Sequence, residues 1–483
     1  MAFRQDIQKA EQSVQEEIKE PLVPREKTEA DEDGYGAEDQ TQKGSKGHEW
    51  MVYFSTFVAV CGYSSPTQSA IREELNLSLA EYSLLGSILT FGAMIGAITS
   101  GPIADFFGRK GAMRMSSGFV LPGGLRSTLL RLKCSRGPIP LDIGRLATGY
   151  GMGVFSYVVP VFIAEIAPKN LPGALTTTNQ LMICTGVSVA FIIGTVLTWR
   201  TLALTGIIPC GVLLIGLFII PESPRWLAKI GRQKEFEAAL RRLRGKDADI
   251  AEEAAEIQVR AFKLQLPLFF KDIGVGLMVF QQFGGINGIC FYVSSIFESA
   301  GFPSDLGTII YAILQVVITA AGATLIDRAG RKPLLLVSAS GLVSGCVLAG
   351  ISFYLKNVIT CKDHLVEQSF DIAPKAAPAL AVTGILLYIG SFSAGMGAVP
   401  WVVMSEIFPI NVKGVAGSLA TLVNWFGAWA VSYTFNFLMS WSSYGTFILY
   451  AAINALAILF GIVVVPETKG RTLEQIQSAI NAS

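Results

Sequence analysis

Long apolar runs separated by short polar segments dominate this chain. Most runs are about 20 residues long, the length that an α-helix needs to cross the hydrocarbon core of a bilayer. The runs lie at residues 50–70, 82–104, 115–136, 142–164, 174–198, 201–220, 268–294, 304–326, 333–355, 376–403, 413–438 and 443–465. This pattern predicts twelve membrane-spanning helices, six on each side of a polar segment at 221–267.

The two sets of six runs share sequence motifs. PIADFFGRKGA at 102–112 returns as LIDRAGRKPLL at 325–335, and EIAPKNLPGAL at 165–175 returns as EIFPINVKGVAGSL at 406–419. PESPRW at 221–226 has a counterpart in PETKGR at 466–471. A duplicated apolar unit of this kind is typical of secondary transporters. We therefore expect an all-α membrane protein with two six-helix bundles, at 50–220 and 268–465.

Composition supports this fold class and excludes others. Hydrophobic residues make up 51% of the chain and charged residues 16%, with a mean hydropathy of +0.49. Soluble domains carry about 25% charged residues. The net charge of +1 gives no reason to expect a nucleic-acid partner. The seven cysteines are scattered and the chain has two histidines, so we expect no metal site, disulfide framework or cofactor. The sequence also lacks a nucleophile paired with a base, so we expect no enzyme activity.

Basic residues predict the orientation in the bilayer. Lys and Arg concentrate in the segments after the second, sixth and eighth runs, around Arg109, Arg225 and Arg331. Because cytosolic loops carry the excess of Lys and Arg, both termini are expected in the cytosol. We predict a disordered cytosolic tail at 1–49, a helical cytosolic linker at 221–267 and a second cytosolic tail at 466–483.

Several motifs resemble those of the sugar porter family of the major facilitator superfamily. They are the paired D-x-x-G-R-K turns, G-R-x-x-x-G-x-G-x-G at 144–153, P-E-S-P-R-W, Q-Q-x-x-G-x-N at 281–287 and P-E-T-K-G-R, and the resemblance covers about residues 50–475. CGYSSPTQSAI at 61, TTTNQLMICTG at 176 and PWVVMSEIFP at 400 resemble the plant early-responsive-to-dehydration-six-like monosaccharide transporters. The resemblance implies hexose transport by alternating access at the vacuolar membrane, with the plasma membrane as the alternative.

A sugar site needs groups that donate and accept hydrogen bonds at once, and carboxamides do both. The resemblance implies a central cavity lined by seven residues, namely Gln180, Gln281, Gln282, Asn287, Gln315, Trp401 and Asn424. The alternative is that these side chains only bond between packed helices. One regular helix would not place Gln281, Gln282 and Asn287 on the same narrow stripe. Because Gly284 and Gly285 lie between them, we predict a local unwinding that brings the three side chains together.

Charged residues at the ends of the runs form a second predicted group. The resemblance implies a cytoplasmic latch made of Asp105, Arg109, Arg145, Glu165, Glu222, Arg225, Asp327, Arg331, Glu406 and Glu467. Pairs of opposite charge are held most strongly where they are partly dehydrated. The alternative is that the repeated turns are only tight, positively charged connectors.

Energy coupling is predicted from an absent acid. Proton-driven sugar porters of the family carry an Asp in the first run, where this chain has Gly62–Pro66, and the run 376–403 also lacks an acid. Facilitated diffusion is therefore expected. The alternatives are a symporter that takes its proton on another carboxylate, and a non-transporting sensor or inactive variant.

The third run departs from the pattern of a membrane span. Arg126, Arg131, Lys133 and Arg136 lie where apolar residues are needed, and each charge costs about 2.5 to 3.5 kcal/mol at a helix centre. A short span with charged ends at the interface is one explanation. A shift of reading frame over about residues 119–137 is the other, because one choice of synonymous codons for residues 119–131, read two bases later, encodes the apolar run CTAGWLAIYFAK. Pro172, where the family usually has Arg, is a second departure.

Overall fold

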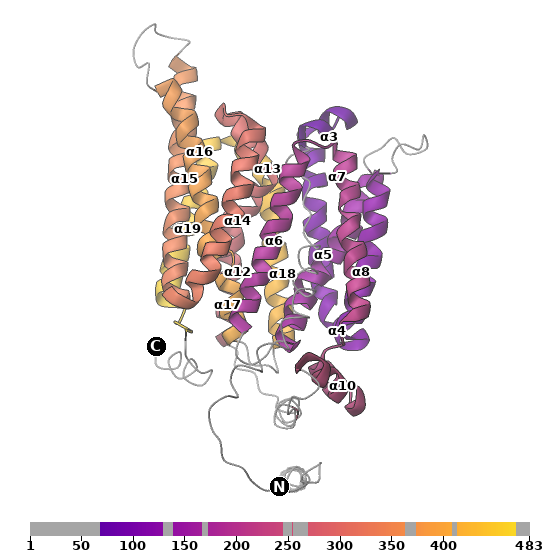
Figure 1. The fold of residues 1–483 in the computed structure, drawn as a ribbon. Helices are drawn as coiled ribbons and strands as arrows, with labels where there is room; N and C mark the ends of the chain where they lie inside the picture. The colour runs from indigo at the N-terminus through magenta and orange to yellow at the C-terminus, as the bar shows by residue number, and fades with distance from the viewer. Residues whose placement is uncertain are drawn as a thin grey trace, which may run out of the picture. The chain divides into compact units, whose positions relative to one another are not determined.

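The computed structural model describes residues 68–128, 139–166, 172–244, 254, 269–362, 373–407 and 413–469, and the regular elements in these segments are helices (Figure 1). In the first half they are α3 (Gln68–Leu75), α4 (Leu79–Thr128), α5 (Ile139–Ile166), α6 (Pro172–Gly194), α7 (Trp199–Thr205) and α8 (Ile207–Ile219). Two short helices follow, α9 (Pro224–Lys229) and α10 (Gln233–Arg244). The second half contains α12 (Phe269–Phe283), α13 (Ile286–Ala300), α14 (Ser304–Ala329), α15 (Arg331–Lys362), α16 (Ala373–Ser391), the π-helix η2 (Phe392–Met396), α17 (Val399–Ile407), α18 (Lys413–Trp441) and α19 (Ser443–Val463).

Where they fall within the described residues, the predicted membrane spans from residue 82 onward lie on helices. Within the described segments, eight helices are long and apolar enough to cross a bilayer, and one of them, Ala80–Leu121, covers the second predicted span and the beginning of the third. The predicted spans at 201–220, 268–294 and 376–403 are each built from consecutive helices with a break between them. The predicted first span, 50–70, lies almost entirely outside the described residues. The all-helical membrane fold expected from the sequence is confirmed.

Helix α4 contains the first copy of the repeated turn. Gly108 has φ 78° and ψ 171°, so the backbone leaves helical geometry there and separates the predicted second and third spans. The helix then continues to Thr128, so the beginning of the third span is helical. The side chain of Arg126 and all of residues 129–138 lie outside what the structure describes, and the frame shift stays a prediction. Pro172 begins α6, where a fixed φ and a missing N–H are tolerated.

Glycines bring α4 and α5 into close contact. A Cβ on Gly149 would lie 2.0 Å from the carbonyl oxygen of Leu89, and one on Gly153 would lie 2.0 Å from that of Ala93. These separations are shorter than any van der Waals contact, so only glycine fits. Small residues four apart are a common way to pack membrane helices, because little hydrophobic force acts between helices in lipid.

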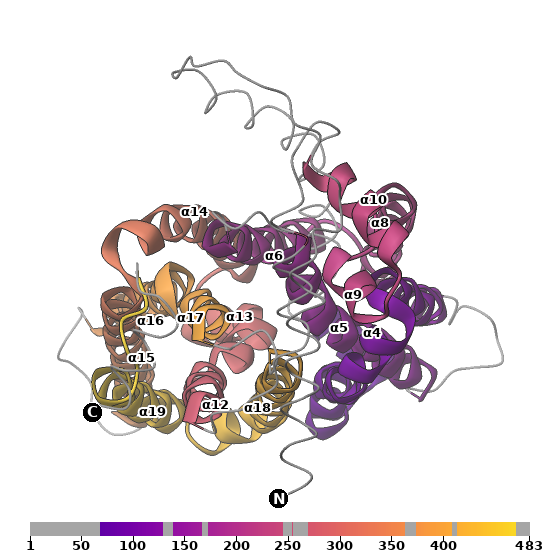
Figure 2. The same cartoon turned by 90° about the horizontal axis from the view of Figure 1, so that it is seen from below.

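The two halves meet mainly along two pairs of helices. In the first half α4, α5 and α8 enclose an apolar core, and a larger core is formed mainly by the helices from α12 to α19. Helix α4 contacts α18, and α6 contacts α14, as seen from below in Figure 2. Each core is thus built mostly by helices of one half, and the facing helices join the two halves.

The close packing of α4 on α5 leads to a prediction about Gly153→Ala. We expect this variant to lower the thermal midpoint of the detergent-solubilised protein, because the added methyl group must displace the backbone of α4. Gly101→Ala is the matched control, since a Cβ there meets nothing within 4 Å and alanine favours the helix by up to about 1 kcal/mol. Equal midpoints for the two variants would contradict the packing argument.

Candidate functional site

The seventh predicted span is broken at two glycines. Helix α12 ends at Phe283 and α13 begins at Ile286, and between them Gly285 adopts a φ of 104°. A Cβ on Gly285 would lie 2.6 Å from the ring of Tyr450. The carbonyl oxygen of Gly284 accepts hydrogen bonds from the Tyr388 hydroxyl (3.0 Å) and from Asn454 Nδ2 (3.1 Å). The unwinding predicted from Gly284 and Gly285 is confirmed, and neighbouring helices satisfy the freed backbone.

The break brings four carboxamides into one hydrogen-bonded group, which we call the carboxamide chain. Asn287 Nδ2 donates to Gln282 Oε1, and Gln282 Nε2 donates to Asn424 Oδ1 (2.5 Å) and Gln281 Oε1 (3.4 Å). These residues come from α12, α13 and α18. Gln281, Gln282 and Asn424 are buried and Asn287 is half-buried. The structure therefore brings together four of the seven residues predicted to bind sugar.

A second helix break anchors this chain. Gln281 Nε2 donates to the carbonyl oxygens of Met396 (2.7 Å) and Gly397 (3.2 Å), at the end of the π-helix η2. Single π turns leave backbone groups outside the α-helical pattern, often at functional sites. Trp401 follows in α17, half-buried and packed against the larger apolar core.

The remaining two predicted binding residues meet at a thiol. Gln180 Nε2 lies 3.6 Å from Cys184 Sγ, and Gln315 Nε2 lies 3.7 Å from the same sulfur. Gln180 and Cys184 belong to α6 of the first half, and Gln315 belongs to α14 of the second. One turn after Asn287, Cys290 Sγ lies 3.1 Å from the Tyr311 hydroxyl. All six amides are neutral, so the arrangement suits an uncharged ligand rich in hydroxyl groups.

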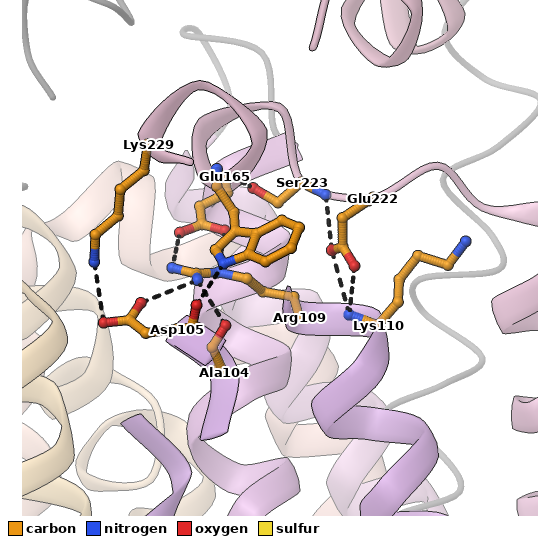
Figure 3. A network of polar contacts seen from close by, with 9 residues as sticks. Ala104, Asp105, Arg109, Lys110, Glu165, Glu222, Ser223 and Lys229 are labelled. Carbon is orange, nitrogen blue, oxygen red and sulfur yellow. Dashed lines mark hydrogen bonds and ion pairs between the residues drawn. The ribbon is translucent and has the colours of Figure 1, made fainter. Parts of the chain in front are cut away.

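The first repeated turn is held by a network of charges (Figure 3). Arg109 makes a bidentate contact with Glu165, with Nε at 2.8 Å from Oε2 and Nη2 at 2.7 Å from Oε1. Arg109 Nη1 also donates to the Ala104 carbonyl (3.0 Å) and to Asp105 (3.2 Å). Lys229 in α9 pairs with Asp105 at 3.0 Å. The guanidinium thus ties α4 to α5, and Asp105 ties α4 to the linker.

The second repeated turn has the same design. Gly330 has φ 94°, and Arg331 Nη2 pairs with Glu406 Oε1 at 2.8 Å. Arg331 Nη1 donates to the Ile326 carbonyl, five residues back, as Arg109 does to Ala104. The two copies of D-x-x-G-R-K therefore fold alike, each with a left-handed glycine and an arginine that bonds a glutamate on another helix of its own half.

A glutamate after each half caps the helix that follows the turn. Glu222 accepts from the backbone N–H groups of Lys110 (3.1 Å) and Ser223 (2.9 Å). Glu467 accepts from those of Arg331 and Lys332, both at 3.0 Å. Carboxylates are stabilised at helix N-termini, where N–H groups lack partners.

The two capping glutamates differ in acidity. Burial raises the pKa of Glu222 above its usual value, outweighing the hydrogen bonds from Ser223 and Lys110 that lower it. Burial acts in the same direction on Glu467, but hydrogen bonds from Lys469, Arg331 and Lys332 outweigh it and lower the pKa. Glu222, in the first half, therefore keeps its proton to a higher pH than Glu467 does.

Arg145 lies far from the charge networks of the two repeated turns. Arg145 is buried near the start of α5 and donates to the Leu85 carbonyl (2.9 Å), whereas Glu165 lies 20 residues further along the same helix, about 30 Å away. The structure thus places Arg145 at the opposite end of the bundle from the other latch residues, and its assignment to the latch is corrected. Arg225 is half-buried in α9, and the side chain of Asp327 lies outside the described residues.

Comparison with known proteins gives the family. The family profile described as "Sugar (and other) transporter" matches residues 46–480. This chain belongs to the sugar transporter family. It is 67% identical to Sugar transporter ERD6-like 7 of Arabidopsis thaliana over 92% of this chain and 97% of that protein. Identity to Sugar transporter ERD6-like 16 of the same plant is 59%, over 89% of this chain and 90% of the relative.

A solved transporter shares the fold of this one. The proton:xylose symporter XylE, in a structure bound to 6-bromo-6-deoxy-D-glucose, aligns with a TM-score of 0.75 and 26% sequence identity, covering 90% of this chain and 99% of that chain. The fold is therefore that of the major facilitator superfamily, and the chain is an integral multi-pass membrane protein.

Sequence reasoning missed several residues that hold this transporter's site. Tyr388 and Asn454 satisfy the broken backbone, and Cys184 lies between two predicted binding amides. Asn454 could have been singled out as the lone carboxamide in an otherwise apolar span, 443–465. Nothing in the sequence distinguishes Cys184 from the other cysteines, because its partner Gln315 comes from the other half.

The burial of the Arg109 and Glu165 pair leads to a prediction about stability. Their side chains are 9% and 12% exposed, so Arg109→Ala leaves an unpaired buried carboxylate and should lower the free energy of unfolding by about 3 kcal/mol. Lys229→Ala is the control, because Lys229 is 58% exposed in its pair with Asp105. This substitution should lower the free energy of unfolding by about 1 kcal/mol or less. Unfolding by SDS in mixed micelles measures both. Similar losses would contradict the role given to Arg109.

The two capping glutamates lead to a prediction about pH. Because its folded-state pKa is lowered, Glu467 stabilises the transporter at neutral pH and loses this effect as the pH falls through that value. Glu467→Gln should therefore lower the thermal midpoint at pH 7, with a difference from wild type that shrinks as the pH falls below the ordinary value of 4.5. The pKa of Glu222 is raised, so Glu222→Gln should leave the midpoint at pH 7 unchanged or higher. Equal losses at pH 7 would refute this asymmetry.

Proposed function

We propose that this protein carries monosaccharides of the hexose type across a membrane by alternating access. The observation that carries the proposal is the carboxamide chain of Gln281, Gln282, Asn287 and Asn424, with Gln180 and Gln315 beside it. Gln180 of the first half and Gln315 of the second half meet at Cys184, and all six amides can donate to and accept from sugar hydroxyls. Membership of the sugar transporter family supports the same substrate class.

Alternating access is supported by how contacts divide within and between the halves. Arg109 with Glu165 joins α4 to α5, and Arg331 with Glu406 joins α15 to α17, so each pair stiffens one half. Contacts between the halves include Asn436 Nδ2 to Ser83 Oγ at 2.8 Å and the stacked rings of Phe191 and Tyr311. Ser83 lies at the end of α4 remote from Arg109. Trp425 Nε1 of α18 also donates to Ser156 Oγ of α5 at 2.8 Å. Because these contacts join neutral groups, two stiff halves can rock about the amides without separating buried charges.

Downhill, energy-independent movement is the mechanism we favour. The six amides of the proposed site carry no charge that could depend on pH, so sugar binding there needs no proton. The first predicted span has Gly62–Pro66, where the resemblance to proton-driven sugar porters implies an acid in those proteins. We therefore favour facilitated diffusion, by a protein with both termini in the cytosol. For the membrane itself we favour the vacuolar one, with the plasma membrane as the alternative.

A proton-coupled mechanism is the second candidate, and Asp142 is the observation that favours it. Asp142 Oδ1 is buried without a hydrogen-bond partner in the described protein, one turn before the buried Arg145. An acid inside a membrane protein is a candidate for proton transfer. Uptake into vesicles with and without an imposed pH gradient separates the two mechanisms. A gradient response that is lost in Asp142→Asn would establish symport, and wild-type flux that ignores the gradient would establish diffusion.

Uptake of labelled hexoses by a hexose-transporter-deficient yeast tests the proposed function. Wild type should restore uptake, and Gln282→Ala should raise the KM at least tenfold, because Gln282 bonds three other amides of the site. Gln233→Ala, which removes an exposed amide in α10, is the matched control and should leave uptake unchanged. Correctly folded wild type without uptake of any hexose would overturn transport in favour of a sensor. Unchanged KM in Gln282→Ala would overturn the site.

A further inference from the structure

We propose that the Cys184 thiol occupies a hydroxyl-binding subsite between Gln180 and Gln315 and competes with the sugar for both amides. This inference rests on the proposed transport function and adds a residue that sets affinity. Cys184 is 4% exposed in the middle of α6, and one helical turn separates it from Gln180. Gln315 reaches the same sulfur from α14, so one thiol lies between amides from the two halves.

Both amides have a weak partner in the sulfur. Gln180 Nε2 and Gln315 Nε2 lie 3.6 and 3.7 Å from Sγ, whereas an amide N–H bonded to oxygen has a typical N···O distance of about 2.9 to 3.0 Å. A thiol is a poor acceptor compared with a hydroxyl. An oxygen ligand that enters between the two amides therefore offers each N–H a better partner than it has now.

A second observation points to the same ligand. Gln315 is 8% exposed, and its Oε1 has no hydrogen-bond donor among the described residues. A buried carbonyl oxygen without a donor costs about 1 to 3 kcal/mol. The backbone carbonyl of Gln315 already accepts from Thr319 Oγ1 at 2.7 Å, so only the side-chain oxygen needs a partner. The amide is thus half satisfied, with a weak acceptor on its nitrogen and nothing on its oxygen.

One sugar hydroxyl meets both needs at once. Its hydrogen can be donated to Gln315 Oε1, while its oxygen accepts from Gln315 Nε2 or Gln180 Nε2 in place of the sulfur. Binding then releases the thiol from its amides. The Cys184 thiol accepts hydrogen bonds weakly enough for a sugar hydroxyl to displace it. Without sugar it is still polar enough to hold the two amides in place, and this balance sets the affinity of the subsite.

Two substitutions of Cys184 separate competition from a structural role, because they should change affinity in opposite directions. Cys184→Ser supplies a stronger acceptor that the sugar must displace, and we expect the KM for glucose uptake to rise about fivefold. Cys184→Ala removes the competitor, and the KM should fall about threefold. Cys346 in α15 is the control, since it is equally buried within the apolar core, and Cys346→Ser and Cys346→Ala should leave the KM unchanged.

A series of deoxyglucoses identifies the hydroxyl and keeps the proposal testable if one variant is unstable. Wild type and Cys184→Ser should differ in KM for every analogue except the one that lacks the hydroxyl bound between Gln180 and Gln315. Equal KM values for both Cys184 variants, changes in the same direction, or a constant ratio across all analogues would overturn the proposal. Absence of uptake by wild type would instead overturn the transport function itself.

Discussion

The buried arginines of the two repeated turns are the constraint on which this structure depends. A guanidinium removed from water is stable only if a carboxylate and enough hydrogen-bond acceptors surround it. Arg109 meets this condition through Glu165, Asp105 and the Ala104 carbonyl, and Arg331 meets it through Glu406 and the Ile326 carbonyl. Since each set of partners belongs to the arginine's own half, satisfying the charge makes each half rigid. The contacts between the halves described above join neutral groups, so separating the halves there leaves no buried charge unpaired.

The breaks in the helices follow from the same requirement applied to the backbone. In lipid every freed carbonyl needs a donor, so a broken span is possible only where other helices supply one. Tyr388 and Asn454 do so for Gly284, and Gln281 does so for Met396 and Gly397. In the last case the donor is itself one of the proposed binding amides. The backbone of η2 thereby fixes the orientation of the carboxamide chain.

Much of the fold could be predicted because membrane thickness sets the length of a span and the repeated turns mark its ends. The break at Gly284 and Gly285 was also predictable, since three polar residues could not share a stripe of a regular helix. Arg145 was misplaced because its motif was grouped with the other charges, although the run from 142 to 164 puts it at the opposite end from Glu165. Contacts such as Gln315 with Cys184 and the π-helix at 392–396 depend on packing between distant segments, and no local pattern encodes them.

Distances between spin labels would test most directly whether the halves move as rigid bodies. Phe106 and Phe218 are exposed positions of the first half, and Val463 is an exposed position of the second. In detergent or nanodiscs, addition of a transported hexose should change the distance distribution between labels at 106 and 463 and leave that between labels at 106 and 218 unchanged. A change within the first half as large as that between the halves, or no change in either pair, would contradict the account.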